Sequence, residues 1–249
     1  MIITNKRKMN KEVFNNRQKR IRDIEWNAIE NEVKHNKGRF LDVGAGTGYA
    51  LSKAESLGFQ THGVEPQINV HGVNDKNLEK TLEKIIFGRA ESLPFEDKYF
   101  NIIYASHSLE HFQNTNKGLS EMLRVLDDNG RVIIIVPTGI MSFINLISQY
   151  LFRSHKRVGR FIFKERSISN LRNIFFPNAH GSQNVTLFGE MFDFRVVSWK
   201  KRIQMYFTID KTILPCLYPF PDFPQFFPFI INSHLSSSVI FVCSKKKDE

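Results

Sequence analysis

The residues of this chain best suited to chemistry are a glycine-rich segment and a carboxylate that follows it. The sequence LDVGAGTG occupies residues 41–48, where three glycines permit positive φ angles and close approach of a ligand to the backbone. Glu65 lies 21 residues after Gly44, the spacing at which an acid at the tip of a second strand can accept hydrogen bonds from a ribose diol. Together these features predict an adenosine-containing ligand at the carboxyl ends of parallel strands.

The glycine spacing separates this segment from two other kinds of nucleotide site. In a dinucleotide-binding turn the third glycine comes one residue later, and a phosphate-binding loop continues with Gly-Lys-Ser or Gly-Lys-Thr. The segment after residue 44 has neither pattern. Cofactors that carry a pyrophosphate, and nucleoside triphosphates, are therefore disfavoured.

The hydrophobic pattern predicts the elements that would position these residues. Short apolar runs at 39–43, 60–65, 84–87, 101–105 and 131–136 alternate with polar helical stretches such as 49–57. Continuous apolar runs of this kind are typical of parallel strands buried on both faces. We therefore predict an α/β fold with a Rossmann-like, doubly wound, mostly parallel sheet and right-handed crossovers.

Three segments fall outside this alternation. Residues 10–34 have apolar residues at helical spacing, which predicts an amphipathic helix within a leading segment 1–37, ahead of a domain at 38–249. Residues 139–190 are predicted to be a helical, Phe-rich insertion, after which two β-like runs at 194–199 and 238–243 would form the antiparallel end of the sheet. Five prolines within 215–229 exclude a regular helix, so 214–230 is predicted to be an extended Pro/Phe-rich loop that packs on the core, caps an apolar cavity or contacts a lipid or partner.

Four blocks, in the same order, resemble the class I S-adenosylmethionine-dependent methyltransferases of the type 11-like group. They are the glycine-rich segment, GVEP at 63–66, GRAESLPF at 88–95 and FNIIYASHSLEH at 100–111. The resemblance covers residue 39 to about residue 137, and the ordered set is far more specific than any single block. It implies S-adenosylmethionine as the cofactor and S-adenosylhomocysteine as the product.

The resemblance also implies roles for residues. Glu65 would bind the ribose, the turn at 88–95 the adenine, and the loop after the fourth strand would face the transferred methyl group. Transfer from a sulfonium mainly needs alignment and exclusion of water, and a hydroxyl acceptor also benefits from a base, for which His107 and His111 are the candidates. The implied cofactor-binding residues are Asp42, Gly44, Ala45, Gly46, Gly48, Tyr49, Glu65, Pro66, Ala90, Glu91, Ser106 and His107.

A metal site in the same loop is a further hypothesis. If a helix begins by His107, then His107, Glu110 and His111 lie at i, i+3 and i+4 and can converge on a cation. The ubiquinone-biosynthesis O-methyltransferases and the small-RNA 2′-hydroxyl methyltransferases are similar here, with Glu-x-x-Glu-His and a divalent metal on the acceptor oxygen. His107 replaces the first acid, which shifts the preference from magnesium towards zinc, iron or manganese. The alternative is a loop without metal, in which Glu110 and His111 cap or pack.

Two residues depart from the family pattern, because Arg89 and Asn101 stand where the family often has Asp. A carboxylate at position 89 would accept a hydrogen bond from the adenine amino group, which a guanidinium cannot do. The backbone of Ala90 and the side chain of Glu91 could substitute.

The composition of the chain limits its possible partners and its location in the cell. The 249 residues hold 35 Lys and Arg against 25 Asp and Glu, and the resulting charge of +10 either favours anionic partners or is dispersed solubilising charge. Two cysteines are too few for a disulfide framework, no apolar signal-peptide core follows the first residues, and no apolar run reaches the roughly 20 residues of a membrane span. We therefore expect a cytoplasmic protein, which could lie peripherally at the inner membrane surface.

The acceptor has to be sought elsewhere, since the fold does not determine it. Residues 177–181, which include His180 as a candidate acceptor contact, resemble methyltransferases encoded with surface-polysaccharide and glycolipid assembly enzymes, as do 199–201 and 236–238. This implies a hydroxyl of a small-molecule or lipid-linked glycan acceptor. A nucleic-acid methyltransferase, a nicotinamide oxidoreductase and a non-catalytic nucleotide-binding module remain alternatives, and the sequence leaves the oligomeric state open.

Overall fold

The computed structural model describes residues 2–66, 83–147, 150, 162, 186–218 and 235–246, with side chains from residue 18 onward. The chain divides into two compact units. Unit 1 consists of Met1–Asn27, Pro137–Ser198 and Leu214–Val239, and unit 2 of Ala28–Val136, Trp199–Ile213 and Ile240–Glu249. Unit 1 thus holds most of the predicted leading helix, the predicted insertion and the Pro/Phe-rich segment, whereas unit 2 holds the glycine-rich segment.

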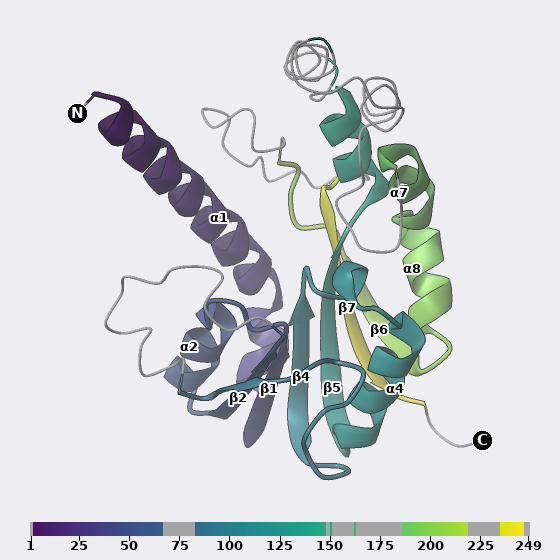
Figure 1. Ribbon diagram of the computed structural model, residues 1–249. Coiled ribbons are helices and arrows are strands. Elements are labelled where there is room, and N and C mark those ends of the chain that lie inside the picture. The colour runs from purple at the N-terminus through teal and green to yellow at the C-terminus, as the bar shows by residue number, and fades with distance from the viewer. Residues whose placement is uncertain are drawn as a thin grey trace. The chain divides into compact units, whose positions relative to one another are not determined.

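A seven-stranded sheet forms the centre of unit 2 (Figure 1), in the order β3-β2-β1-β4-β5-β7-β6. Strand β1 pairs in parallel with β2 and β4, β2 with β3, and β4 with β5, whereas β6 and β7 are antiparallel. The predicted Rossmann-like sheet with an antiparallel end is confirmed. The strands are β1 Arg39–Val43, β2 Gln60–Glu65, β3 Ile85–Phe87, β4 Phe100–Ser106, β5 Leu126–Pro137, β6 Phe207–Ile213 and β7 Ser238–Lys245.

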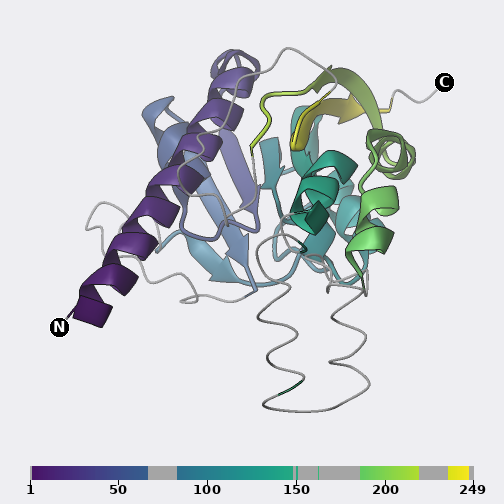
Figure 2. The same ribbon diagram turned by 90° about the horizontal axis from the view of Figure 1, so that it is seen from above.

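Helices α2 and α4 connect strands of this sheet, α2 between β1 and β2 and α4 between β4 and β5 (Figures 1 and 2). Helix α2 packs on β1 and β2 and buries one apolar face. Asn114 caps the N-terminus of α4, because its side chain accepts a hydrogen bond from the Lys117 amide. A further helical stretch, 139–147, follows β5. The bounds are α1 Ile2–Lys34, α2 Tyr49–Ser56, the 3-10 helix η1 Leu109–His111, α4 Thr115–Val125, α7 Leu187–Asp193 and α8 Val196–Ile203.

The predicted strand at 194–199 is wrong, because this segment ends α7 and begins α8. Its β-branched and aromatic residues indicated a strand, but Trp199 and Ile203, four positions apart, are the buried residues of α8. The last strand pair instead uses β6, which sequence reasoning missed. In β6 the residues Asp210, Lys211 and Thr212 form a polar run, and the register shift near Asp210 interrupts the strand pattern.

Buried hydroxyls hold the described part of unit 1 together. The Ser236 hydroxyl donates to the Cys216 carbonyl at 2.8 Å, and the Ser237 hydroxyl donates to the Tyr218 carbonyl at 2.8 Å. Ser238 donates to Glu25 Oε1 of α1 at 2.7 Å, and all three serines are buried. These side chains join three segments that lie far apart in the sequence, and their hydrogen bonds replace those lost to water.

Parts of the predicted insertion and loop lie outside the described residues. These parts are 148–149, 151–161, 163–185 and 219–234, which include His180 and most of the Pro/Phe-rich loop. The boundaries 1–37, 139–190 and 214–230 stay predictions. Within the described ranges, no helix combines the length and apolarity needed to cross a membrane.

Both cysteines are buried free thiols. Burial, with a smaller contribution from the Glu25 carboxylate, raises the pKa of Cys216 to about 12, and burial likewise raises the pKa of Cys243. Neither thiol is therefore a thiolate nucleophile at neutral pH.

His62 in β2 is enclosed by aromatic rings. Its Nε2 atom is buried and has no hydrogen-bond partner among the described residues. Burial lowers the pKa of His62, and the nearby charges of Arg39 and Lys84 lower it further. The rings that meet the imidazole edge-on, at centroid distances of 5.5 to 6.0 Å, belong to Phe95, Tyr99 and Phe100.

This enclosure predicts an acid-sensitive fold. Because the pKa of His62 is lower in the folded state than in the unfolded state, the neutral ring favours folding above the unfolded value of about 6.5. That contribution is lost as the pH falls through the lower, folded value. We expect urea midpoints measured at pH 7 and pH 5 to differ less for His62→Phe than for the wild type. The exposed His35, changed to Gln, is the control, and an unchanged pH dependence in His62→Phe would contradict this account.

Candidate functional site

The ends of three neighbouring strands meet at one edge of the sheet in unit 2. The register pairs Val43 of β1 with Val64 of β2, and Asp42 with Tyr104 of β4, so the strands end at nearly the same level. The glycine-rich turn follows β1, Glu65 ends β2, and Ser106 ends β4. The predicted cofactor residues from these strands are therefore brought together at the carboxyl edge, where open α/β sheets bind ligands.

Hydrogen bonds join the tips of β1 and β2. The amides of Gly44 and Ala45 donate to the Val64 carbonyl at 2.8 and 3.1 Å, and the Gly46 amide donates to Glu65 Oε2 at 2.9 Å. The carboxylate is only partly buried. Glu65 is thus fixed beside the turn, with its acceptor oxygens at the place predicted for the ribose.

Gly44 is required by packing within the protein. It has a φ of 85°, and a Cβ there would come within 2.5 Å of the Ser108 Cβ. The Ser108 hydroxyl donates to the Val43 carbonyl at 2.8 Å, so the loop after β4 is fastened to the end of β1. The sequence block at 100–111 contained Ser108, but no role followed from it because its partner is a backbone carbonyl 65 positions away.

Gly46 is different, because the space beside it is open. Its φ is 52°, and a Cβ built on it would meet no atom within 4 Å. An open position on a turn, next to the Glu65 carboxylate and at the carboxyl ends of three strands, fits the adenosine part of the predicted cofactor. The residues present therefore fit this group.

His107 has an unusual backbone conformation. Its φ is 50°, a left-handed conformation that costs a non-glycine residue about 1 kcal/mol, and its amide donates to the Ile135 carbonyl at 2.8 Å. Its Nδ1 lies 3.9 Å from Oε1 of Glu110, whose side chain is 1% exposed, against 18% for His107. Strained residues of this kind are enriched at functional sites, which supports His107 as a candidate base.

The loop does not have the helical geometry on which the metal hypothesis depended. The 3-10 helix η1 begins at Leu109 after Ser108, and His107 precedes it in a left-handed conformation, so positions 107, 110 and 111 do not share one helical face. His111 is exposed. Within the described residues, no group of three His, Cys, Asp or Glu side chains could hold a metal ion. The structure brings His107 and Glu110 together.

The turn predicted to bind adenine is held by helix α4. Arg124 donates to the carbonyls of Leu93 and Phe95 at 2.9 and 2.8 Å and is paired with Glu121 and Asp97. Its hydrogen bonds to these carboxylates raise the pKa of Arg124 above its usual value. The arginine therefore stays charged and fixes the backbone at 93–97.

Within that turn, Ala90 is buried and Arg89 is exposed. Glu91 Oε1 accepts a hydrogen bond from the Asn114 amide at 3.0 Å. Glu91 is the carboxylate that could replace the Asp missing at position 89, and one of its oxygens thus already holds the loop before α4. The second departure from the family pattern has a structural reason. Asn101 Oδ1 accepts from the Arg39 amide at 2.9 Å, a role that an amide oxygen fills as well as a carboxylate.

The other predicted cofactor residues lie on the same three segments. Asp42 is buried in β1, and Gly48 has a φ of 76° and precedes Tyr49, the first residue of α2. Pro66 is exposed directly after β2, and Ser106 is buried at the end of β4. These positions are consistent with the predicted roles, which stay predictions.

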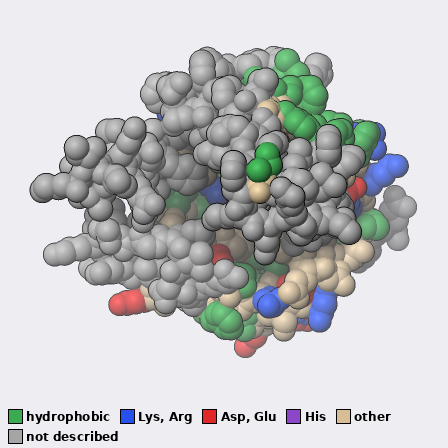
Figure 3. Space-filling model, turned by 45° about the horizontal axis from the view of Figure 1, so that its top comes forward, with side chains coloured by type: hydrophobic (Ala, Val, Ile, Leu, Met, Phe, Trp, Pro, Cys, Tyr) green, Lys and Arg blue, Asp and Glu red, His purple; other side chains and the backbone are tan. Residues whose placement is uncertain are grey.

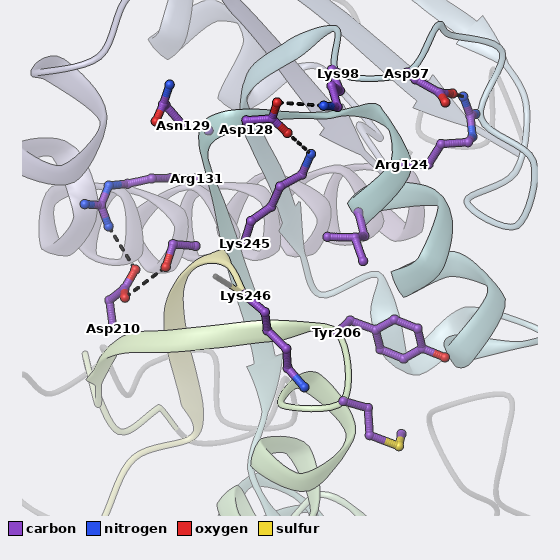
Figure 4. A pocket seen from close by; sticks show the side chains of 14 residues that line it. Asp97, Lys98, Arg124, Asp128, Asn129, Arg131, Tyr206, Asp210, Lys245 and Lys246 are labelled. Carbon is purple, nitrogen blue, oxygen red and sulfur yellow. Dashed lines mark hydrogen bonds and ion pairs between the residues drawn. The ribbon is translucent and has the colours of Figure 1, made fainter. Parts of the chain in front are cut away.

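A separate hollow of about 1080 Å³ lies at the opposite edge of the sheet, among the residues before β4 and β6 and at the end of β7 (Figure 4). Several of its charges pair with one another: Asp128 contacts Lys98 and Lys245 at 2.7 and 2.9 Å, and Asp210 contacts Arg131 at 3.0 Å. Cations that are already neutralised in this way are poorly suited to bind phosphates. We therefore place the candidate site at the carboxyl edge.

Comparisons with known proteins agree with this geometry. Residues 41–134 match the family described as "Methyltransferase domain". The chain is 30% identical over 155 residues to the uncharacterized methyltransferase YcgJ of Bacillus subtilis (strain 168), covering 59% of this chain and 58% of the relative. It is 35% identical over 105 residues to the ubiquinone/menaquinone biosynthesis C-methyltransferase UbiE of Vibrio parahaemolyticus, covering 39% of this chain and 40% of the relative.

A solved structure shares the fold. An S-adenosylmethionine-dependent methyltransferase from Thermotoga maritima has 18% sequence identity and a TM-score of 0.50, with 86% of each chain covered. The chain spans less than two thirds of the length of the two curated relatives named above.

The two open glycines of unit 2 give a matched test of the turn. Gly46 and Gly58 both have positive φ angles and no atom within 4 Å of a built Cβ, but only Gly46 lies beside Glu65. We expect Gly46→Val and Gly58→Val to destabilise the fold to a similar extent, by at most a few kcal/mol. Only Gly46→Val should abolish binding of S-adenosylmethionine, measured by titration calorimetry. Normal binding by a folded Gly46→Val protein would show that the turn does not face the cofactor.

Proposed function

Because residues 41–134 match the family described as "Methyltransferase domain", we propose that the protein is a class I S-adenosylmethionine-dependent methyltransferase that methylates a hydroxyl of a glycan or lipid-linked acceptor. One observation carries the proposal: Glu65, hydrogen-bonded to the Gly46 amide, stands beside an open turn at the carboxyl ends of β1, β2 and β4. Such an arrangement suits an adenosine ligand that has no pyrophosphate.

The residues at this edge divide the binding of the cofactor between them. Glu65 would accept hydrogen bonds from the ribose hydroxyls, and the turn at Gly46 would allow the backbone close approach. Ala90 and Glu91 would contact the adenine, on a loop that Arg124 fixes to α4. When bound, S-adenosylmethionine supplies a methyl group carried on a positively charged sulfur, and the sulfur becomes a neutral thioether when the methyl group is transferred.

His107 is the candidate for removing the proton of the acceptor hydroxyl. Glu110, buried 3.9 Å from Nδ1, would orient the ring and stabilise the imidazolium that forms when Nε2 takes the proton. The hydrogen bond from the His107 amide to Ile135 holds the backbone of this residue in place. The chain itself thus offers a base together with a group that orients it.

The choice of acceptor rests on chemistry outside the domain match. The net charge of +10 favours a phosphorylated or otherwise anionic acceptor, and the relatives named UbiE carry the name of C-methyltransferases of ubiquinone/menaquinone biosynthesis. Those relatives align over 39% of this chain and are named for methylation of carbon, so carbon is the alternative to a hydroxyl that the acceptor test distinguishes.

The first test concerns the cofactor. We expect calorimetry to detect S-adenosylmethionine and S-adenosylhomocysteine binding, with Glu65→Ala weakening it by about 1.5 to 3 kcal/mol, the range for hydrogen bonds to a charged group. Glu96→Ala, an exposed acid on the same loop as the adenine turn, serves as the control. If a folded Glu65→Ala protein bound equally well, Glu65 would not hold the ribose. Binding of NADH instead would favour an oxidoreductase.

The second test concerns the acceptor. Cell extract is separated into lipid, glycan and nucleic-acid fractions and incubated with methyl-labelled cofactor and the protein. Label in the lipid or glycan fraction, released as methyl iodide when hydriodic acid cleaves the methyl ether, is the expected result. Label in the nucleic-acid fraction, or on carbon, would replace the proposed acceptor, and no label in any fraction would favour a non-catalytic module. Full activity with a chelator would remove the metal hypothesis.

The third test asks whether His107 is the base, by replacing this residue with glycine. His107 and Lys98 both have left-handed backbones, with φ values of 50° and 55°, so glycine relieves strain at either position. We expect both His107→Gly and Lys98→Gly to stay folded, and His107→Gly alone to lower the methylation rate by about 10²- to 10⁴-fold at saturating cofactor. A rate reduced equally in both variants, or in neither, would count against His107 as the base.

A further inference from the structure

The helical stretch 139–147 of unit 1 buries a mixed face, with Met141 and Leu146, and exposes an apolar one. Ser142 and Asn145 are buried, whereas Phe143 is 49% exposed and Ile147 is 43% exposed, four positions further along. Tyr150, seven positions after Phe143, is also exposed. A helix that packs only on its own domain normally buries its apolar stripe, so this exposed stripe indicates a second, apolar environment.

The neighbouring helix α7 shows the same feature. Phe188 and Phe192, again four positions apart, are exposed, and Phe192 is 54% exposed. The two helices touch directly, because the Gly139 amide donates to the Phe194 carbonyl at 2.9 Å and a Cβ at Gly139 would collide with the Met191 carbonyl. We name this set the apolar surface of unit 1: Phe143, Ile147, Tyr150, Phe188, Phe192 and, at the start of α8, Val197.

Among the described residues, an arginine lies at this surface. Arg195 lies with its guanidinium carbon 5.6 Å from the ring centre of Phe192. Residues 139–190 hold seven Lys and Arg against two Glu, together with seven Phe. Figure 3 shows hydrophobic side chains gathered along one side of the visible face, with Lys and Arg side chains beside them.

We propose that the apolar surface of unit 1 docks on a membrane whose headgroups are anionic. Aromatic and aliphatic side chains, exposed on helices and accompanied by cations, insert at the boundary of headgroups and acyl chains while the cations attract acidic lipids. A second copy of the chain fits less well, because self-association would bring together two chains that each carry a net charge of +10. The proposal is independent of methyl transfer, since it concerns lipid binding by unit 1.

The test is flotation of the full-length protein with phosphatidylcholine vesicles, with and without phosphatidylglycerol, at low and high salt. We expect the wild type to float with the acidic vesicles, and to do so less at high salt. The double variant Phe188→Ser, Phe192→Ser should lower the partition coefficient at least about tenfold, since each ring removed takes apolar area out of the membrane. Phe87→Ser, which changes a 72% exposed residue of β3 in unit 2, is the matched control and should bind like the wild type.

A second pair, Phe143→Ser with Ile147→Ser, tests the other helix and keeps the proposal falsifiable if the first pair fails to fold. Thermal unfolding and cofactor affinity are measured for each variant, so loss of lipid binding is distinguished from loss of the cofactor site. No flotation of the wild type, or equal flotation with and without acidic lipid, would overturn the proposal. So would sedimentation showing a lipid-free dimer that the serine variants dissociate.

Discussion

The hydrogen bond from the Ser108 hydroxyl to the Val43 carbonyl joins the loop after β4 to the end of β1, and the absence of a side chain at Gly44 makes room for it. Glu65 reaches the same turn from β2 through the Gly46 amide. Three strand ends are thereby fixed as one rigid edge before any ligand binds. Because these strand ends are already ordered, the protein loses less conformational entropy when a ligand binds.

The two units differ in what their polar groups do. In unit 2, acids and bases pair within networks, as Arg124 does with Glu121 and Asp97, and these pairs fix loops around the candidate site. In unit 1, neutral hydroxyls of Ser236 and Ser237 bond to backbone carbonyls inside the unit. The buried acid Glu25 of unit 1 likewise accepts a hydrogen bond from a hydroxyl, that of Ser238.

Short apolar runs allowed the sheet to be predicted, because strands buried on both faces carry a signal that hydrophobicity alone reveals. The signal was weaker at the antiparallel end, where the exposed strand β6 contains Asp210 and Lys211 and α8 begins with two valines. The glycine segment and Glu65 could be predicted because their spacing follows from the turn geometry. The role of Ser108 and the left-handed backbone of His107 depend on contacts with Val43 and Ile135, which no local pattern encodes.

The bond between Ser238 and Glu25 spans 213 positions of the chain, and Thr138 bonds to the Ser236 carbonyl across 98. During translation, Glu25 therefore leaves the ribosome long before its partner has been made. The leading helix, which contains Glu25 and Trp26, must wait for the segment that holds Ser238. Strands β1, β2 and β4 can pair with one another earlier. Because non-local contacts of this kind form slowly, unit 1 is the part of the nascent protein with the longest need for protection by chaperones.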